Sequence, residues 1–175
     1  MLPSRDRAFI QIVDAAMAEA AQRSGARVVC RSGCNRCCHG PFEISWLDAI
    51  RLRAGLAELD ARDPLRAVAI RQRAFAPPDD PGEDEPCPAL DPITGRCELY
   101  TSRPITCRTF GAPVRYLERA VSICELNFVG ANDEEIAECA AEVDPDGLEM
   151  ELILEVERTE RLTGVTSVAE ALRLK

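Results

Sequence analysis

Lysine and histidine are almost absent from this chain, which has only Lys175 and His39. Its 21 basic residues are outnumbered by 30 acidic ones, so the formal net charge is −9. The imbalance is uneven: residues 1–75 hold 12 arginines and 8 acidic residues, a net charge of +4, whereas residues 76–175 have a net charge of −13. Proteins that bind nucleic acid in general present a basic face to the phosphates. The composition therefore excludes general nucleic-acid binding and leaves only a local basic patch open.

Long apolar runs are missing as well. No segment approaches the ~18 to 20 apolar residues that a membrane span needs. The start of the chain also lacks the uninterrupted apolar stretch of a secretory signal, because Asp6, Asp14 and Glu19 interrupt it. We therefore expect no membrane association and a cytoplasmic location, where thiols stay reduced.

Cysteine, in contrast, is abundant, with nine residues. Four of them and the single histidine fall within residues 30–40, CRSGCNRCCHG. Because the expected compartment is reducing, and because an odd total leaves one cysteine unpaired, this cluster indicates a metal site rather than a set of disulfides. The nine cysteines are Cys30, Cys34, Cys37, Cys38, Cys87, Cys97, Cys107, Cys124 and Cys139.

Apolar residues at helical spacing predict a mostly α protein. Ser45 is the expected N-terminal cap of the second helix, and Asn132 or Asp133 that of the fourth. Helices are predicted at residues 4–23, 45–59, 64–75, 134–143, 146–162 and 167–172.

Two segments between these helices lack helical periodicity. The acidic, proline-rich segment 77–86 predicts a loop, and the turn residues of 87–111 predict a small hairpin or knuckle. We therefore expect one small helical domain over residues 1–175 with an irregular cysteine-rich metal-binding insert. The cysteine cluster region spans 27–128, and the C-terminal helices span 132–175.

The spacing C-x3-C-x2-C-C places three or four thiolates within one tight turn, where they can converge on a metal at the ~2.3 Å of a Zn–S bond. Adjacent side chains usually diverge, so Cys37 and Cys38 are expected to point in different directions. Cys139 is expected in the core, because it shares a helical stretch with Ile136 and Val143. The other eight cysteines suffice for two four-thiolate sites, for an iron–sulfur cluster with a zinc, or for one cluster that leaves several thiols free.

Arginines lie beside many of these thiols. A zinc ion with four thiolates carries a net charge of −2, which guanidinium groups can compensate, although each arginine can equally be an ordinary surface residue. His39 can replace a thiolate as a ligand or remain outside the coordination shell. The arginines concerned are Arg31, Arg36, Arg96, Arg103 and Arg108.

The run Cys30-x3-Cys34-x2-Cys37 matches the motif of radical SAM enzymes, in which three thiolates hold a [4Fe–4S] cluster. Those enzymes place the motif after the first strand of a large βα barrel. Here it follows a predicted helix, and the chain is too short and has no βα repeat. The barrel fold is therefore excluded, whereas iron–sulfur ligation stays open.

The two cysteine regions together resemble the YkgJ-type cysteine-cluster family, whose members are described as zinc- or iron-chelating. The resemblance covers residues 27–128 and rests on eight cysteines in order, on Cys87-Pro88-x-Leu90 and on the run LYxxRPxxCRxFG. A related pattern in flagellin lysine methylases implies an iron–sulfur cluster, but the absence of a glycine-rich SAM-binding signature gives methyl transfer no support. The resemblance implies that the metal ligands are Cys30, Cys34, Cys37, Cys38, Cys87, Cys97, Cys107 and Cys124.

Three functions fit these residues. We favour a metal-binding protein whose cysteines chelate iron or zinc. Eight thiols exceed the need of one zinc site, which favours an iron–sulfur cluster, although two zinc sites would also use all eight. The second is an iron–sulfur redox enzyme or electron-transfer protein. The third is a structural zinc protein or a metal-delivery protein that docks a protein partner through its acidic helices. None of these residues indicates a particular reaction or substrate.

Overall fold

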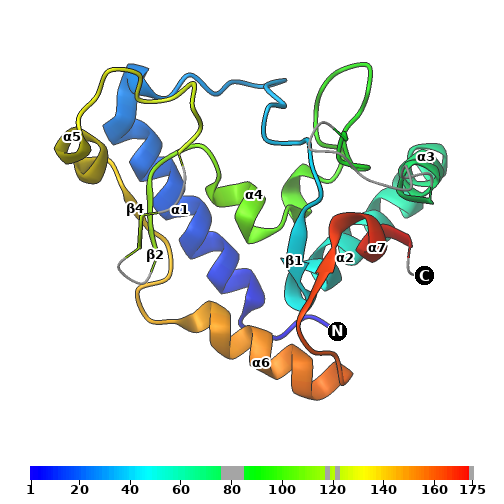
Figure 1. Cartoon of the computed structure of the whole chain (residues 1–175). Helices are drawn as coiled ribbons and strands as arrows, with labels where there is room; N and C mark the ends of the chain where they lie inside the picture. Colours follow the sequence, from blue (N-terminus) through cyan, green and yellow to red (C-terminus); the bar gives the residue numbers. More distant parts are fainter. Residues whose placement is uncertain (76–84, 117–118, 121–122, 174–175) are drawn as a thin grey trace. The chain divides into compact units, whose positions relative to one another are not determined.

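Helices are the main elements of the computed structural model, as the sequence predicts (Figure 1). The structure describes residues 1–75, 85–116, 119–120 and 123–173. Unit 1 comprises Met1–Leu2, Ser32–Pro104 and Glu155–Lys175, and unit 2 comprises Pro3–Arg31 and Ile105–Leu154. The loop predicted at 77–86 lies, except for its last two residues, outside the described residues.

Unit 1 is built around helices that pack against one another, α2 (Trp46–Arg62), α3 (Pro64–Phe75) and α7 (Val168–Arg173). Ser45 caps α2 as predicted, since its hydroxyl accepts the backbone N–H of Asp48 at 3.1 Å. The helices enclose one apolar cluster, which consists of Ile44, Ala49, Leu52, Leu56, Leu59, Ala67, Ile70, Ala74, Ala89, Leu99, Val168, Ala171 and Leu172.

A short antiparallel ribbon closes one side of this cluster. Strand β1 (Glu43–Ser45) pairs with β5 (Val165–Ser167), and Ile44 lies opposite Thr166. The sequence does not predict this ribbon, because each strand has only three residues and their pairing joins distant parts of the chain.

The segment between Cys97 and Cys107 packs directly on α2. The short 3-10 helix η2 (Tyr100–Ser102) contacts α2, and Gly55 of α2 faces Ser102. A Cβ atom added at Gly55 would lie 2.4 Å from the Cβ of Ser102 and 2.2 Å from its hydroxyl oxygen. Glycine is therefore required here by close approach rather than by backbone conformation.

Unit 2 contains α1 (Asp6–Ser24), the 3-10 helix η1 (Gly25–Arg27), α4 (Ile105–Thr109) and α5 (Asp133–Glu138), and α6 (Leu148–Glu160) begins in it. Helix α1 packs on α4 and on β4 through a face that includes Phe9, Val13 and Ala20. Strand β2 (Val114–Tyr116) pairs antiparallel with β3 (Arg119–Ala120) and parallel with β4 (Ala141–Glu142).

The helix predicted at 134–143 is shorter than expected. Asn132 caps α5 as predicted, and its side chain forms a reciprocal capping box with Glu135. The helix ends at Glu138, however, and the backbone N–H of Ala141 donates to the Pro113 carbonyl at 2.8 Å. Pairing with a distant strand therefore overrides the local helical pattern.

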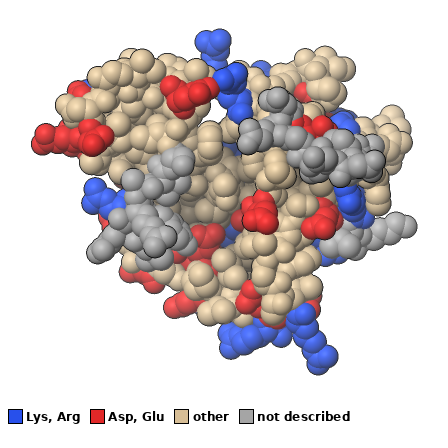
Figure 2. Space-filling model, in the orientation of Figure 1, with Lys and Arg blue, Asp and Glu red and all other residues tan. Residues whose placement is uncertain are grey.

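The charged side chains on the face in Figure 2 lie in small groups, with uncharged atoms between them. Among the described helices, none combines the length and the hydropathy needed to cross a membrane.

Gly55 provides a test of the packing between α2 and η2. Alanine normally stabilises a helix interior relative to glycine by about 0.5–1 kcal/mol. We predict that Gly55→Ala instead lowers the free energy of unfolding by roughly 1–3 kcal/mol, because overpacking forces η2 away from α2. Urea denaturation measures the change. Adding Ser102→Gly should restore the lost stability, and a stabilised Gly55→Ala single variant would contradict the proposed contact.

Candidate metal centre

Backbone hydrogen bonds join the two cysteine segments of unit 1. The N–H of Cys87 donates to the carbonyl of Cys38 at 2.8 Å, and the N–H of Gly40 donates to the carbonyl of Glu85 at 2.8 Å. His39 and Pro86 form an antiparallel bridge between these two bonds. The first cysteine run therefore lies directly beside the start of the second.

The second segment folds back on itself as the predicted hairpin. Leu90 and Cys97 form an antiparallel bridge, and the N–H of Glu98 donates to the carbonyl of Ala89 at 2.8 Å. The carboxylate of Asp91 accepts the N–H groups of Ile93 and Thr94, which fixes the turn between the two arms. This hairpin returns Cys97 toward Cys87.

The adjacent thiols of Cys37 and Cys38 converge. A hydrogen bond links the two side chains, so the expectation that they point in different directions is wrong. A turn explains the difference, because the N–H of Cys38 donates to the carbonyl of Asn35 at 2.8 Å. The hydrogen bond between the two thiols, burial and the charge of Cys38 together raise the pKa of the Cys37 thiol.

Cys87 and Cys97 are half-buried and pack against the apolar cluster of unit 1. Burial raises the pKa of the Cys87 thiol to about 11, and the charge of Cys97 acts in the same direction. Burial is also the main reason why the pKa of Cys97 is raised, and the charge of Cys37 contributes to it. Cys37, Cys38, Cys87 and Cys97 thus form a thiol group in which neighbouring members influence one another electrostatically; we call it the unit 1 thiol group.

Two arginines lie within electrostatic range of this group. The guanidinium of Arg103 stacks 3.5 Å from the centre of the Tyr100 ring. Its positive charge lowers the pKa of Cys37 and of Cys97, against the larger effects that raise them. Arg73 donates through Nε to the Pro88 carbonyl at 2.8 Å, and its charge lowers the pKa of Cys87 against the larger effect of burial. Two guanidinium groups match the net charge of −2 that a divalent metal with four thiolates would have.

The cysteine pattern of the sequence indicates Arg103 but not Arg73. Arg73 lies on α3, distant in sequence from every cysteine, and only the packing of α3 beside the hairpin brings it close. Arg108, which the sequence also named, instead forms two hydrogen bonds with the Asp14 carboxylate, at 2.7 and 2.9 Å.

The remaining cysteines of unit 1 and unit 2 have different surroundings. Cys34 is exposed, within unit 1. In unit 2, Cys30 is exposed, Cys107 is half-buried on α4, and Cys124 is buried. The predicted ligands are therefore divided, with Cys34 and the unit 1 thiol group in unit 1 and Cys30, Cys107 and Cys124 in unit 2.

Cys139 lies in the core, and the ring of His39 contacts a backbone carbonyl. Cys139 is buried at the C-terminal end of α5, as expected for a core residue. The Nδ1 atom of His39 lies 3.0 Å from the carbonyl oxygen of Asn35, to which a protonated Nδ1 donates.

Within the described ranges, no three Cys, His, Asp or Glu side chains already stand around a common metal position. The thiols of the unit 1 group are instead hydrogen-bonded or packed on apolar atoms. Their chemistry nevertheless fits zinc or iron, which both prefer thiolate sulfur. Coordination would require each thiol to lose its proton and the side chains to turn toward one point.

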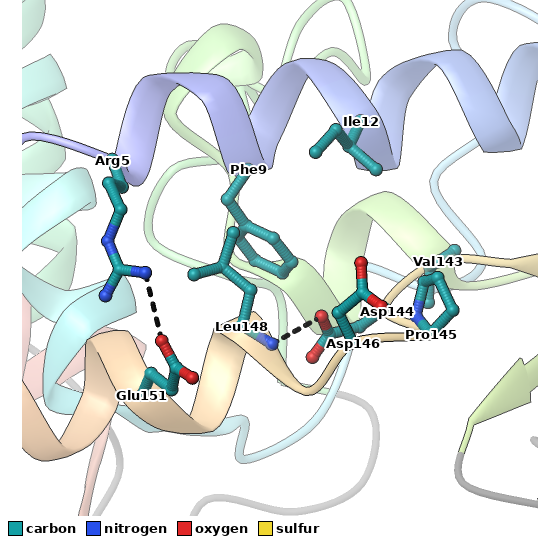
Figure 3. Close-up of a pocket in the computed structure, with 9 residues that line it drawn as sticks. All are labelled: Arg5, Phe9, Ile12, Val143, Asp144, Pro145, Asp146, Leu148 and Glu151. Atoms are coloured by element: carbon teal, nitrogen blue, oxygen red, sulfur yellow. Dashed lines mark hydrogen bonds and ion pairs between the residues drawn. The ribbon is translucent and has the colours of Figure 1, made fainter.

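A pocket of about 270 Å³ in unit 2 contains no thiol. Apolar side chains of Phe9, Ile12 and Leu148 line it, and Arg5 pairs with Glu151 at 3.0 Å across its edge (Figure 3). It offers no soft ligand for zinc or iron.

The raised thiol pKa values predict a pH dependence of the metal-free protein. Because the folded pKa of Cys87 lies above the ordinary 9.0, its contribution to stability is complete below pH 9 and is lost as the pH rises toward 11. We expect the thermal midpoint to fall over this range and to fall less in a Cys87→Ala variant. Other thiols of the chain, Cys97 among them, also titrate at alkaline pH, so the difference between the two profiles, and not the fall itself, reports on Cys87. Identical pH profiles of the two proteins would contradict the burial of Cys87.

Comparison with known proteins identifies a family for this chain. No curated protein and no solved structure matches the chain. A family model named CxxCxxCC, described as "Putative zinc- or iron-chelating domain", matches residues 29–135. The name has two residues between its first two cysteines, whereas three separate Cys30 from Cys34. Because this family model covers more than half of the chain, the chain belongs to the CxxCxxCC family of zinc- or iron-chelating domains.

Proposed function

We propose that this protein holds zinc or iron through cysteine thiolates and that the unit 1 thiol group forms its principal site. The observation that carries the proposal is the backbone pairing of Cys38 with Cys87, which brings the Cys37–Cys38 pair beside a hairpin carrying two more thiols. Four thiolates saturate a tetrahedral metal.

The role that we propose for this metal is structural. A four-thiolate site has no open position for a substrate, and two of its ligands pack on the apolar cluster. Bound metal would connect the first cysteine run and the hairpin to α2 and α3. Because the binding site forms only in the folded chain, metal binding would add to the free energy of folding.

Zinc and iron are both bound by thiolate sulfur. Four cysteines can hold either Zn²⁺ or an iron–sulfur cluster. Cys30, Cys107 and Cys124 of unit 2 supply further thiols, as the resemblance implies, and the total of eight favours iron–sulfur ligation. A reducing compartment such as the cytoplasm would keep all of them available.

Metal analysis of Cys→Ser variants tests the proposal. We expect protein purified without oxygen to contain zinc or iron, and Cys87→Ser or Cys97→Ser to lose most of it, because a serine hydroxyl is a poor ligand for either metal. Elemental analysis with an acid-labile sulfide assay measures the content: sulfide near equal to iron indicates a cluster, and zinc without sulfide indicates a mononuclear site.

Cys139→Ala is the control, since it removes a buried thiol outside the proposed ligand set. It should keep its full metal content. Undiminished metal in both Cys87→Ser and Cys97→Ser would contradict the site.

A further inference from the structure

Asn127 lies beside the first cysteine of the chain and is 5% exposed. Its carboxamide contacts Cys30, Val29 and Gly111, all within unit 2. No pattern in the sequence predicts a role for Asn127, because asparagine is common in turn-rich segments.

The hydrogen bonds of Asn127 fix the orientation of its amide. Its Oδ1 accepts the backbone N–H of Val29 at 3.0 Å, and its Nδ2 donates to the carbonyl of Gly111. The Val29 N–H is a donor and the Gly111 carbonyl is an acceptor, so exchanging the oxygen and nitrogen of the amide would break both hydrogen bonds. The Nδ2 group therefore directs its remaining N–H toward Cys30 Sγ, 3.5 Å away.

Gly111 and Cys124 complete this arrangement. The φ angle of Gly111 is 98°, which disfavours any side chain, and an added Cβ would lie 3.4 Å from Cys30 Sγ and 3.9 Å from the Cβ of Cys124. The N–H of Asn127 also donates to the carbonyl of Cys124 at 2.8 Å. One turn thus holds Asn127 and Cys124 together beside the Cys30 sulfur.

The N–H contact suits a sulfur atom that binds a metal. A neutral Cys30 thiol has a second, longer contact with Asn127 Oδ1 at 3.9 Å, in which the S–H is the donor. A thiolate has no S–H and accepts the Nδ2–H as a charge-assisted bond. Ligating thiolates are strengthened in the same way by N–H donors outside the coordination shell.

We propose that Asn127 is a positioning residue that orients the Cys30 sulfur, beside Gly111 and Cys124, as a thiolate for metal. The inference rests on the proposed function, because it takes Cys30 as a metal ligand. In unit 2, a side-chain amide as well as the backbone thus holds the Cys30 sulfur in place.

The variant Asn127→Asp tests the proposal with Co²⁺ as the probe. It keeps the acceptor for Val29 but replaces the donor with a carboxylate oxygen, which repels a thiolate. In a Cys87→Ser/Cys97→Ser background, which removes the unit 1 site, we expect the dissociation constant for Co²⁺, followed by thiolate-to-cobalt charge-transfer absorption, to rise by about 10–100-fold when Asn127→Asp is added. Asn132→Asp is the matched control, because aspartate caps α5 as well as asparagine does, and it should leave Co²⁺ binding in that background unchanged.

Adding Cys30→Ser to the Cys87→Ser/Cys97→Ser background separates positioning from a general structural role. There, adding Asn127→Asp should leave Co²⁺ affinity unchanged; an equal loss in both backgrounds would overturn the proposal. A second measurement needs no variant: on adding Cd²⁺ to ¹⁵N-labelled wild-type protein, the Asn127 side-chain NH₂ signals should shift, and unmoved signals would overturn the proposal as well.

The outcomes also distinguish this inference from the proposed function. A wild-type protein without charge-transfer absorption would overturn the proposed function and this inference with it. Normal Co²⁺ binding by the wild type, with the same Co²⁺ affinity in the Cys87→Ser/Cys97→Ser background before and after Asn127→Asp is added, would overturn the role of Asn127 alone.

Discussion

The hydrogen bond from the Cys87 N–H to the Cys38 carbonyl, 2.8 Å long, holds together the two cysteine segments that would form the proposed metal site of unit 1. It joins segments that are 49 positions apart in sequence and sets the register of the His39–Pro86 bridge. The hairpin then returns Cys97 to the same region. Backbone geometry alone thus assembles two pairs of thiols, and the side chains need only turn and lose their protons to bind a metal.

Electrostatics decides in which state these thiols exist. Burial against the apolar cluster of unit 1 raises the pKa of Cys87 and Cys97, so the metal-free thiols stay neutral in the folded protein at neutral pH. A divalent metal reverses this preference, because its charge stabilises thiolates far more than burial destabilises them. Arg73 and Arg103 supply positive charge at the same place, and they lower the cost of the excess negative charge that four thiolates introduce.

Local patterns predicted the parts of the fold that local interactions determine. The caps at Ser45 and Asn132, the helix from Pro64 to Phe75 and the turn at Asp91 all follow from neighbouring residues. The pairing of β2 with β4 and the shortening of α5 could not be predicted, because distant strands compete there with helical periodicity. At the candidate site, spacing identified the cysteines, whereas the convergence of Cys37 with Cys38 and the positions of Arg73 and Asn127 depend on tertiary contacts. Family membership supports the metal chemistry but names no reaction.

In the proposed site, sulfur atoms of this chain surround the metal. X-ray absorption spectroscopy of the metal-bound protein tests it most directly, because the technique reports the type and distance of the atoms next to the metal. We expect a first shell of sulfur alone, at about 2.3 Å, whether the metal is zinc or iron. A shell in which nitrogen or oxygen supplies half or more of the ligands would contradict it, since the unit 1 thiol group could not then be the site.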